Sequence, residues 1–91
     1  MVDSLEKRQK RLIFRSWHRG TKEMDLLMGS FADEYAMGFS ADEVDTYEEI
    51  LKENDPDLYN WISGREEAPE RMASEVFERL CGWRFKNAAN S

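Results

Sequence analysis

The middle of the chain carries apolar residues with the period of an α-helix. Between residues 24 and 35 they occur at i, i+3, i+4, i+7 and i+11, which places them on one face of a helix. The members of this stripe are Met24, Leu27, Met28, Phe31 and Tyr35. The pattern predicts an amphipathic helix that buries this face in a core. Gly29 lies within the stripe, where glycine costs about 1 kcal/mol relative to alanine, so we expect a bend or a close helix contact there. Gly38 is expected to end the element.

Another helix is predicted before this stripe, over residues of about 3–17. The stretch contains no glycine or proline, and its apolar character strengthens toward its C-terminal half. The rest of its surface is basic, through Lys7, Arg8, Lys10, Arg11 and Arg15. The simplest interpretation of these cations is a solvated helix face.

Two further helices are predicted after Gly38. Ser40-Ala41-Asp42-Glu43 has the spacing of a capping box, in which the serine and glutamate side chains each accept a backbone N–H. This helix should run to about Glu53. Asp55-Pro56 predicts the next helix, with the aspartate as its cap and the proline at its first position. Ser63-Gly64 should stop it.

Pro69 is expected to begin the last helix. Its inner face would consist of Met72, Ala73, Val76, Phe77 and Leu80. After Trp83 the chain becomes polar, and residues of about 86–91 are expected to form a frayed tail. With no strand pattern and no internal repeat, the sequence predicts an all-α fold, a compact five-helix bundle in which residues 1–91 form a single domain.

The charge is distributed unevenly along the chain. Residues 1–23 carry seven basic and three acidic side chains, which gives +4, whereas the remainder carries six basic and sixteen acidic side chains, which gives −10. A basic arm on an acidic body indicates a partner with its own charged surface and argues against a general nucleic-acid binder.

Several classes of function lack their signatures. Cys81 is the single cysteine, so no intramolecular disulfide can form and a reducing compartment is expected. His18 is the single histidine, and its place beside Arg19 favours a surface or helix-end role. The sequence has no zinc-type spacing, no glycine-rich phosphate loop and no apolar run long enough to cross a bilayer. A binding module is therefore expected, with no catalytic and no metal-binding residues, no tightly bound cofactor, and no membrane insertion.

The stretch Arg19-Gly20-Thr21-Lys22-Glu23-Met24-Asp25 stands at the junction of the first two predicted helices. Its simplest interpretation is helix punctuation, since glycine turns the chain and acids in a first turn meet the positive end of the helix dipole. The same residues also carry a resemblance. Arg-Gly-x-x-Glu followed by an apolar residue and Asp, in a short acidic helical chain, resembles the signature of the succinate dehydrogenase assembly factors, the flavinylation factors of the SdhE type.

The resemblance extends over residues of about 8–84. Asp55-Pro56-Asp57-Leu58-Tyr59-Asn60-Trp61 is similar to the family's Asp-Pro-Asp-Leu-aromatic-x-Trp stretch, and Phe31-Ala32-x-x-Tyr35 fits between the two motifs. We assign Trp61 mainly to the core, since Leu58 precedes it at i−3. Tyr35 and Tyr59 remain open between the edge of the core and an interface.

This resemblance implies an assembly factor, and not an enzyme, that binds the flavoprotein subunit of succinate dehydrogenase and, in some bacteria, of fumarate reductase. Its role would be to promote covalent attachment of FAD, the client's cofactor, to a client histidine, by holding imidazole and flavin in near-attack geometry. The residues expected to contact the client are Arg19, Gly20, Glu23, Asp25, Arg8, Arg15 and Lys22.

Two alternatives stay open at the level of the sequence. A helical adaptor could dock through its basic N-terminal helix on nucleic acid or an anionic surface, and its binding would weaken steeply with salt. A small enzyme with an unfamiliar carboxylate site would turn over substrate without any client. A monomer is expected. The compartment would be the cytoplasm of a bacterium or the mitochondrial matrix of a eukaryote, and the short N-terminus, without room for a transit peptide, favours the bacterium.

Overall fold

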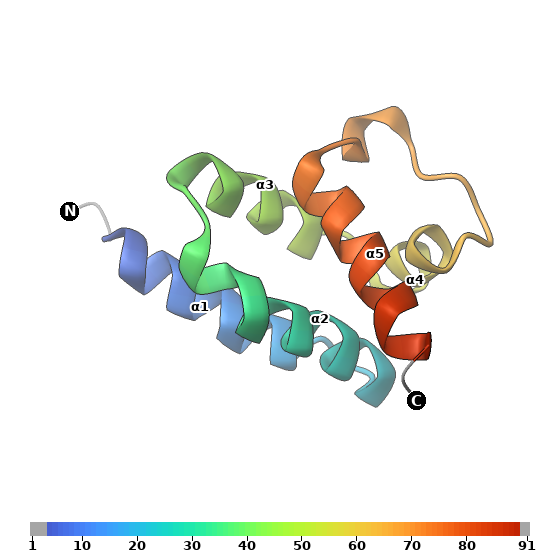
Figure 1. Cartoon of the computed structure of the whole chain (residues 1–91), viewed down its shortest axis with the longest axis horizontal. Coiled ribbons are helices and arrows are strands. Elements are labelled where there is room, and N and C mark those ends of the chain that lie inside the picture. The colour runs from blue at the N-terminus through green and yellow to red at the C-terminus, as the bar shows by residue number, and fades with distance from the viewer. Residues whose placement is uncertain (1–3, 90–91) are drawn as a thin grey trace.

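The computed structural model describes residues 4–89, with side chains as far as residue 83, and the regular structure of these residues is helical throughout (Figure 1). The elements in chain order are α1 (Leu5–Trp17), α2 (Lys22–Tyr35), the 3-10 turn η1 (Ala36–Gly38), α3 (Ala41–Leu51), α4 (Asp55–Ser63), the 3-10 turn η2 (Glu70–Met72) and α5 (Glu75–Ala89). The predicted all-α fold with five α-helices is confirmed for this part of the chain. The expected helix start near residue 3 lies outside the described residues.

Helices α1 and α2 lie side by side and run in opposite directions, and α3, α4 and α5 lie on the other side of the molecule (Figure 1). Helix α1 packs against α2, η1 and α3, while α5 packs against α2, α3 and α4. Helix α2 therefore packs against both α1 and α5. The largest fully buried side chains are Tyr47, Phe31, Leu12, Met28, Leu58 and Leu80. None of the helices within residues 4–89 is both long enough and apolar enough to span a membrane.

Gly29 brings α1 and α2 into close contact, as its position in the apolar stripe predicted. The indole ring of Trp17 lies against its backbone, so that a Cβ atom added at Gly29 would be 2.2 Å from the ring. Trp17 Nε1 also donates a hydrogen bond of 3.1 Å to Asp33 Oδ1. The glycine therefore removes a side chain where another helix needs the space.

A buried hydrogen-bond group joins α1, α2 and α3. The Tyr47 hydroxyl lies 2.8 Å from Ser16 Oγ and 3.4 Å from the Met28 carbonyl. Ser16 Oγ also lies within hydrogen-bond distance of the Leu12 carbonyl, at 2.7 Å. Burial raises the pKa of the Tyr47 phenol, because the charged form would lose its hydration. The phenol therefore stays neutral and the group acts as a structural tie.

The termini of α3 and α4 follow local sequence signals, with a correction at the cap of α4. Ser40 and Glu43 form the predicted capping box, and Gly64 ends α4 in the left-handed conformation with φ 84°. The cap of α4 is Asn54 and not Asp55, because the Asn54 side chain accepts from the Asp57 N–H. Asp55 is consequently the first helical residue, and its carboxylate is available for another contact.

The prediction for the last helix was wrong at its start. Pro69 precedes the turn η2, and the chain is extended at Ala73 before α5 begins. Ser74 Oγ accepts a 3.0 Å hydrogen bond from the Phe77 N–H and so occupies the place of a cap. Ala73 is therefore exposed and does not belong to the inner face. Helix α5 continues to Ala89, through residues 86–89 of the predicted tail, and residues 90–91 lie outside the described residues.

Candidate functional site

The loop between α1 and α2 turns at Gly20. This residue has a φ of 138°, which L side chains rarely adopt, and it is exposed. The Asp25 carboxylate, from the first turn of α2, accepts hydrogen bonds from the N–H groups of Arg19 at 2.6 Å and of Gly20 at 3.3 Å. Thr21 caps α2 by accepting from the Met24 N–H. The loop backbone is thus fixed from both sides, while the surface at Gly20 stays open.

Arg19 holds this loop to the other half of the molecule. Its Nε donates a hydrogen bond of 2.8 Å to Asp55 Oδ1. Its two terminal nitrogens donate hydrogen bonds of 2.6 Å, one to the Leu51 carbonyl and one to the Glu53 carbonyl. The side chain is only 10% exposed, and that of Asp55 16%. The Leu51 carbonyl is at the last residue of α3 and the Glu53 carbonyl lies just beyond it, where helical acceptors lack partners within the helix. Arg19 therefore joins α1, the end of α3 and the start of α4.

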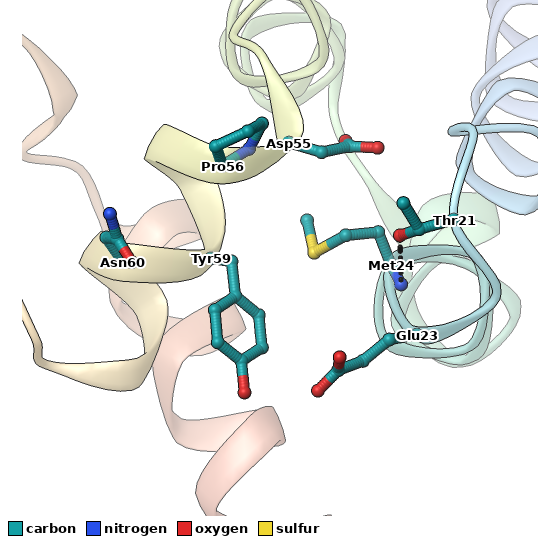
Figure 2. Close-up of a pocket in the computed structure, with 7 residues that line it drawn as sticks. All are labelled: Thr21, Glu23, Met24, Asp55, Pro56, Tyr59 and Asn60. Carbon is teal, nitrogen blue, oxygen red and sulfur yellow. Dashed lines mark hydrogen bonds between the residues drawn. The ribbon is translucent and has the colours of Figure 1, made fainter.

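An open groove of about 260 Å³ lies between the first turn of α2 and α4 (Figure 2). It is lined by Thr21, Glu23, Met24, Asp55, Pro56, Tyr59 and Asn60. In Figure 2 the Glu23 carboxylate and the Tyr59 ring face each other across the groove, with the Met24 side chain between the two helices. The Arg-Gly-x-x-Glu motif and the Asp-Pro-Asp-Leu motif thus meet at one site.

The structure separates the predicted site residues into three groups. Gly20, Lys22 and Glu23 are exposed beside the groove. Arg19 and Asp25 direct their polar atoms into the protein, where they fix the loop. The partner-binding roles of all five residues remain predictions, but the observed contacts of Arg19 and Asp25 are intramolecular.

Arg8 and Arg15 belong to the third group, on α1. Arg8 binds the carboxylates of Asp45 at 2.5 Å and Glu48 at 2.8 Å, both on α3. These hydrogen bonds raise the pKa of Arg8 above its usual value. Arg15 is half-buried, and no ion-pair partner for it occurs within residues 4–83. Neither residue lines the groove.

Several groove residues were missed as site residues by sequence reasoning. Met24 was assigned to the core, and it is indeed 2% exposed, but part of its surface still lines the groove. Asp55 and Pro56 were assigned to a helix start and to the second motif, and Tyr59 was left open between the edge of the core and an interface. Trp61 was assigned mainly to the core, but it is only half-buried and packs against the core from its edge, with the Arg71 guanidinium 5.7 Å from its ring centre. The motif itself was the signal that could have identified the α4 wall of the groove.

The single histidine and the single cysteine have structural surroundings in the part of the chain that the structure describes. His18 caps the end of α1, stacks on Phe14 and donates from Nδ1 to the Phe14 carbonyl, so it has the predicted helix-end role. Burial raises the pKa of the Cys81 thiol, which lowers its nucleophilicity at neutral pH. Within the described residues, no three histidine, cysteine or carboxylate side chains are grouped as a metal site.

Comparison with known proteins relates the sequence of this chain to one family. A family model described as Sdh5, flavinator of succinate dehydrogenase, matches residues 10–84. The FAD assembly factor SdhE of Acetobacter pasteurianus is 41% identical over 78 residues, covering 86% of this chain and 72% of that protein. The mitochondrial succinate dehydrogenase assembly factor 2 of Dictyostelium discoideum is 36% identical over 77 residues, covering 85% of this chain and 55% of that protein. The mitochondrial succinate dehydrogenase assembly factor 2 of Debaryomyces hansenii is 42% identical over 61 residues, covering 67% of this chain and 43% of that protein. The chain thus spans about half the length of these mitochondrial relatives.

Proposed function

Because the chain belongs to the family of succinate dehydrogenase flavinators, we propose that it binds the flavoprotein subunit of succinate dehydrogenase and promotes covalent attachment of FAD to a histidine of that client. The observation that carries this proposal is the groove, in which the two motifs that identify the family form opposite walls. Gly20 and the Glu23 carboxylate lie beside this groove, and both residues are exposed to solvent.

A factor of this kind needs no catalytic group of its own. The client supplies the imidazole and holds the flavin, and the factor stabilises the client conformation in which the two meet. Gly20, Lys22 and Glu23 would form the contact surface. Arg19 and Asp25 would act as positioning residues, because their hydrogen bonds fix the loop that presents Gly20. Arg8 and Arg15 would extend the contact along α1.

FAD itself does not fit the groove of this chain. The Glu23 and Asp55 carboxylates line the groove and would repel the pyrophosphate of the dinucleotide. One N–H group at the start of each helix, that of Met24 in α2 and that of Asp57 in α4, is also bonded to the side chain of the cap, Thr21 or Asn54. The flavin is therefore assigned to the client, and this chain would act on the client protein.

The finer features of the proposal concern clients and compartment. The flavoprotein subunit of fumarate reductase would be a second client, since the same positioning mechanism applies to any flavin attached through a histidine. The factor would act as a monomer, without enzymatic turnover, in the cytoplasm of a bacterium or in the mitochondrial matrix. Relatives from a bacterium and from mitochondria support both compartments.

The contacts of α1 favour this function over an adaptor for nucleic acid or anionic surfaces. Arg8 is bound by two carboxylates of α3, and Lys10 pairs with Glu6 at 3.0 Å. Part of the basic charge is thus balanced within the protein, which reduces the attraction for a polyanion.

The decisive experiment is co-expression of the succinate dehydrogenase flavoprotein subunit with this protein, followed by in-gel flavin fluorescence after denaturation. We expect wild type to raise covalent flavin and Gly20→Arg and Glu23→Ala to lose most of that gain. Glu34→Ala is the matched control, because Glu34 is exposed on the same face of α2, three turns or about 16 Å away. Circular dichroism must show that all variants are folded. Equal covalent flavin with and without the wild-type protein would refute the proposal for this client.

A further inference from the structure

We propose that the groove between α2 and α4 receives an arginine side chain of the client protein. This inference rests on the proposed function and specifies the chemistry that the client presents. It follows from the apolar lining of the groove, the carboxylate at its mouth and the state of the two helix N-termini beside it.

The walls of the groove suit the aliphatic part of a long side chain. Met24, Pro56 and the ring of Tyr59 provide apolar surface on both sides, as Figure 2 shows. Long cationic side chains bury their methylene groups along such surfaces while the charged end stays near water. A volume of about 260 Å³ holds one such side chain.

The charge of the groove selects a cation. Glu23 is exposed and has no ion-pair partner within the described part of the chain. Asp55 also lines the groove, and Arg19 binds only its Oδ1 atom. No lysine or arginine lines the groove. A basic side chain placed here would therefore meet unpaired carboxylate oxygen.

The N-termini of α2 and α4, which lie beside the groove, do not make it a site for anions. Helix starts attract anions through free N–H groups, but here the Met24 N–H binds Thr21 Oγ1 and the Asp57 N–H binds Asn54 Oδ1. The acids of the first turns, Glu23 and Asp25 in α2 and Asp55 and Asp57 in α4, stand at these positive ends of the helix dipoles instead. A phosphate group would meet carboxylates where it needs donors.

Arginine fits these groups better than lysine. Its planar guanidinium can bind a carboxylate through two N–H groups and stack on an aromatic ring at the same time. The ring of Tyr59 already accepts such a contact, since the Arg65 guanidinium lies 5.6 Å from its centre. Arg65 does not line the groove, so a client arginine would use the part of the ring that faces Glu23.

The first test uses the isolated protein and a small probe. ¹⁵N-labelled protein is titrated with N-acetyl-arginine amide and, in parallel, with N-acetyl-citrulline amide, which has nearly the same shape without the charge. We expect the arginine probe alone to shift the amide signals of residues 21–24 and 59–60. Glu23→Gln should weaken this binding about two- to fivefold, as expected for the loss of one exposed ion pair, and Glu34→Gln should leave it unchanged. Equal shifts with citrulline, or an unaltered affinity in Glu23→Gln, would overturn the inference.

The second test uses the client. Exposed arginines of the flavoprotein subunit are changed one at a time to glutamate, and each variant is co-expressed with wild-type or Glu23→Arg factor. One client variant should lose covalent flavin with the wild-type factor and recover it with Glu23→Arg. A complete scan without such a rescued pair would contradict the arginine assignment while leaving the proposed function intact. If wild-type factor never raises covalent flavin, the proposed function fails, and the probe titration still decides what the groove binds.

Discussion

Two glycines, nine residues apart, show how the same residue type serves opposite purposes in this protein. At Gly29 the missing side chain allows Trp17 of the same molecule to approach the backbone of α2. At Gly20 the nearest atom to an added Cβ is Asp55 Oδ2 at 3.7 Å, and the constraint is the φ of 138°. The first glycine is needed for packing, and the second for a turn whose surface stays open. Variants of the two regions should therefore separate stability from client activity.

The largest loss of stability should come from removing the anchor of the Gly20 loop. Arg19→Ala leaves two carbonyls at the end of α3 and the Asp55 carboxylate without their donor. We expect the free energy of unfolding to fall by about 3 kcal/mol, measured by urea denaturation with tryptophan fluorescence. Arg15→Ala, on the preceding helix α1, should cost less than about 1 kcal/mol. Similar losses in the two variants would show that the Arg19 contacts contribute little.

Gly29→Ala should cause the next largest loss. The added Cβ would overlap the Trp17 ring at 2.2 Å, and the helices must separate to admit it, so we expect a destabilisation of about 2 kcal/mol. Gly82→Ala is the matched control. Gly82 also lies in a helix, α5, but a Cβ there meets nothing within 4 Å, so this variant should be more stable by up to about 1 kcal/mol. If both variants changed the free energy of unfolding in the same direction, the role of the Trp17 contact would be contradicted.

Gly20→Ala should have a smaller effect on stability and a larger one on function. Forcing alanine to a φ of 138° costs about 1 kcal/mol of unfolding free energy, while the displaced loop should lose client binding. Gly64→Ala imposes similar strain at a φ of 84°, in open space and away from the groove. It should lose comparable stability and keep full flavinylation in the co-expression assay. Loss of covalent flavin in both variants would mean that strain alone explains the defect.

The smallest effect should be the loss of stability in acid that comes from the ion pair between Glu53 and Arg71. Hydrogen bonds from Arg71 lower the pKa of the Glu53 carboxylate, while the Glu53 carbonyl accepts from Arg19. Since the folded pKa is lowered, this contribution to stability is present above the unfolded pKa and is lost as pH falls through the folded value. Wild type should therefore lose more stability than Glu53→Gln between pH 6 and pH 3, as measured by urea denaturation. If the free energy of unfolding fell equally with pH in wild type and Glu53→Gln, Glu53 would have no part in the loss of stability in acid.

Local sequence signals predicted most of the fold. The stripe at residues 24–35 and the capping box at Ser40 depend on neighbours within one or two turns, and both are confirmed. The start of α5 was mispredicted because Pro69 fits a 3-10 turn as well as a helix start, and only the extended residue Ala73 separates the two. Such a break depends on how η2 fits against the rest of the fold.

The inward direction of Arg19 could not be predicted from its surroundings in the sequence. Its partners are 32 to 36 residues away, and two of them are backbone carbonyls, which leave no trace in residue identity. For the same reason the groove was not predicted, although both of its motifs were recognised. Spacing along the chain identifies each wall, but only the packing of α2 near α4 brings Glu23 opposite Tyr59.

The groove is assembled from segments more than thirty residues apart, so it exists only in the folded chain. A client that binds there must then shift the folding equilibrium toward the native state, by about 2.7 kcal/mol when its free concentration is a hundredfold above the dissociation constant. For a small domain of marginal stability this is a substantial part of the total. Proteolysis of the free protein should accordingly be faster than that of the complex, and the cellular level of the factor would follow the supply of client awaiting its flavin.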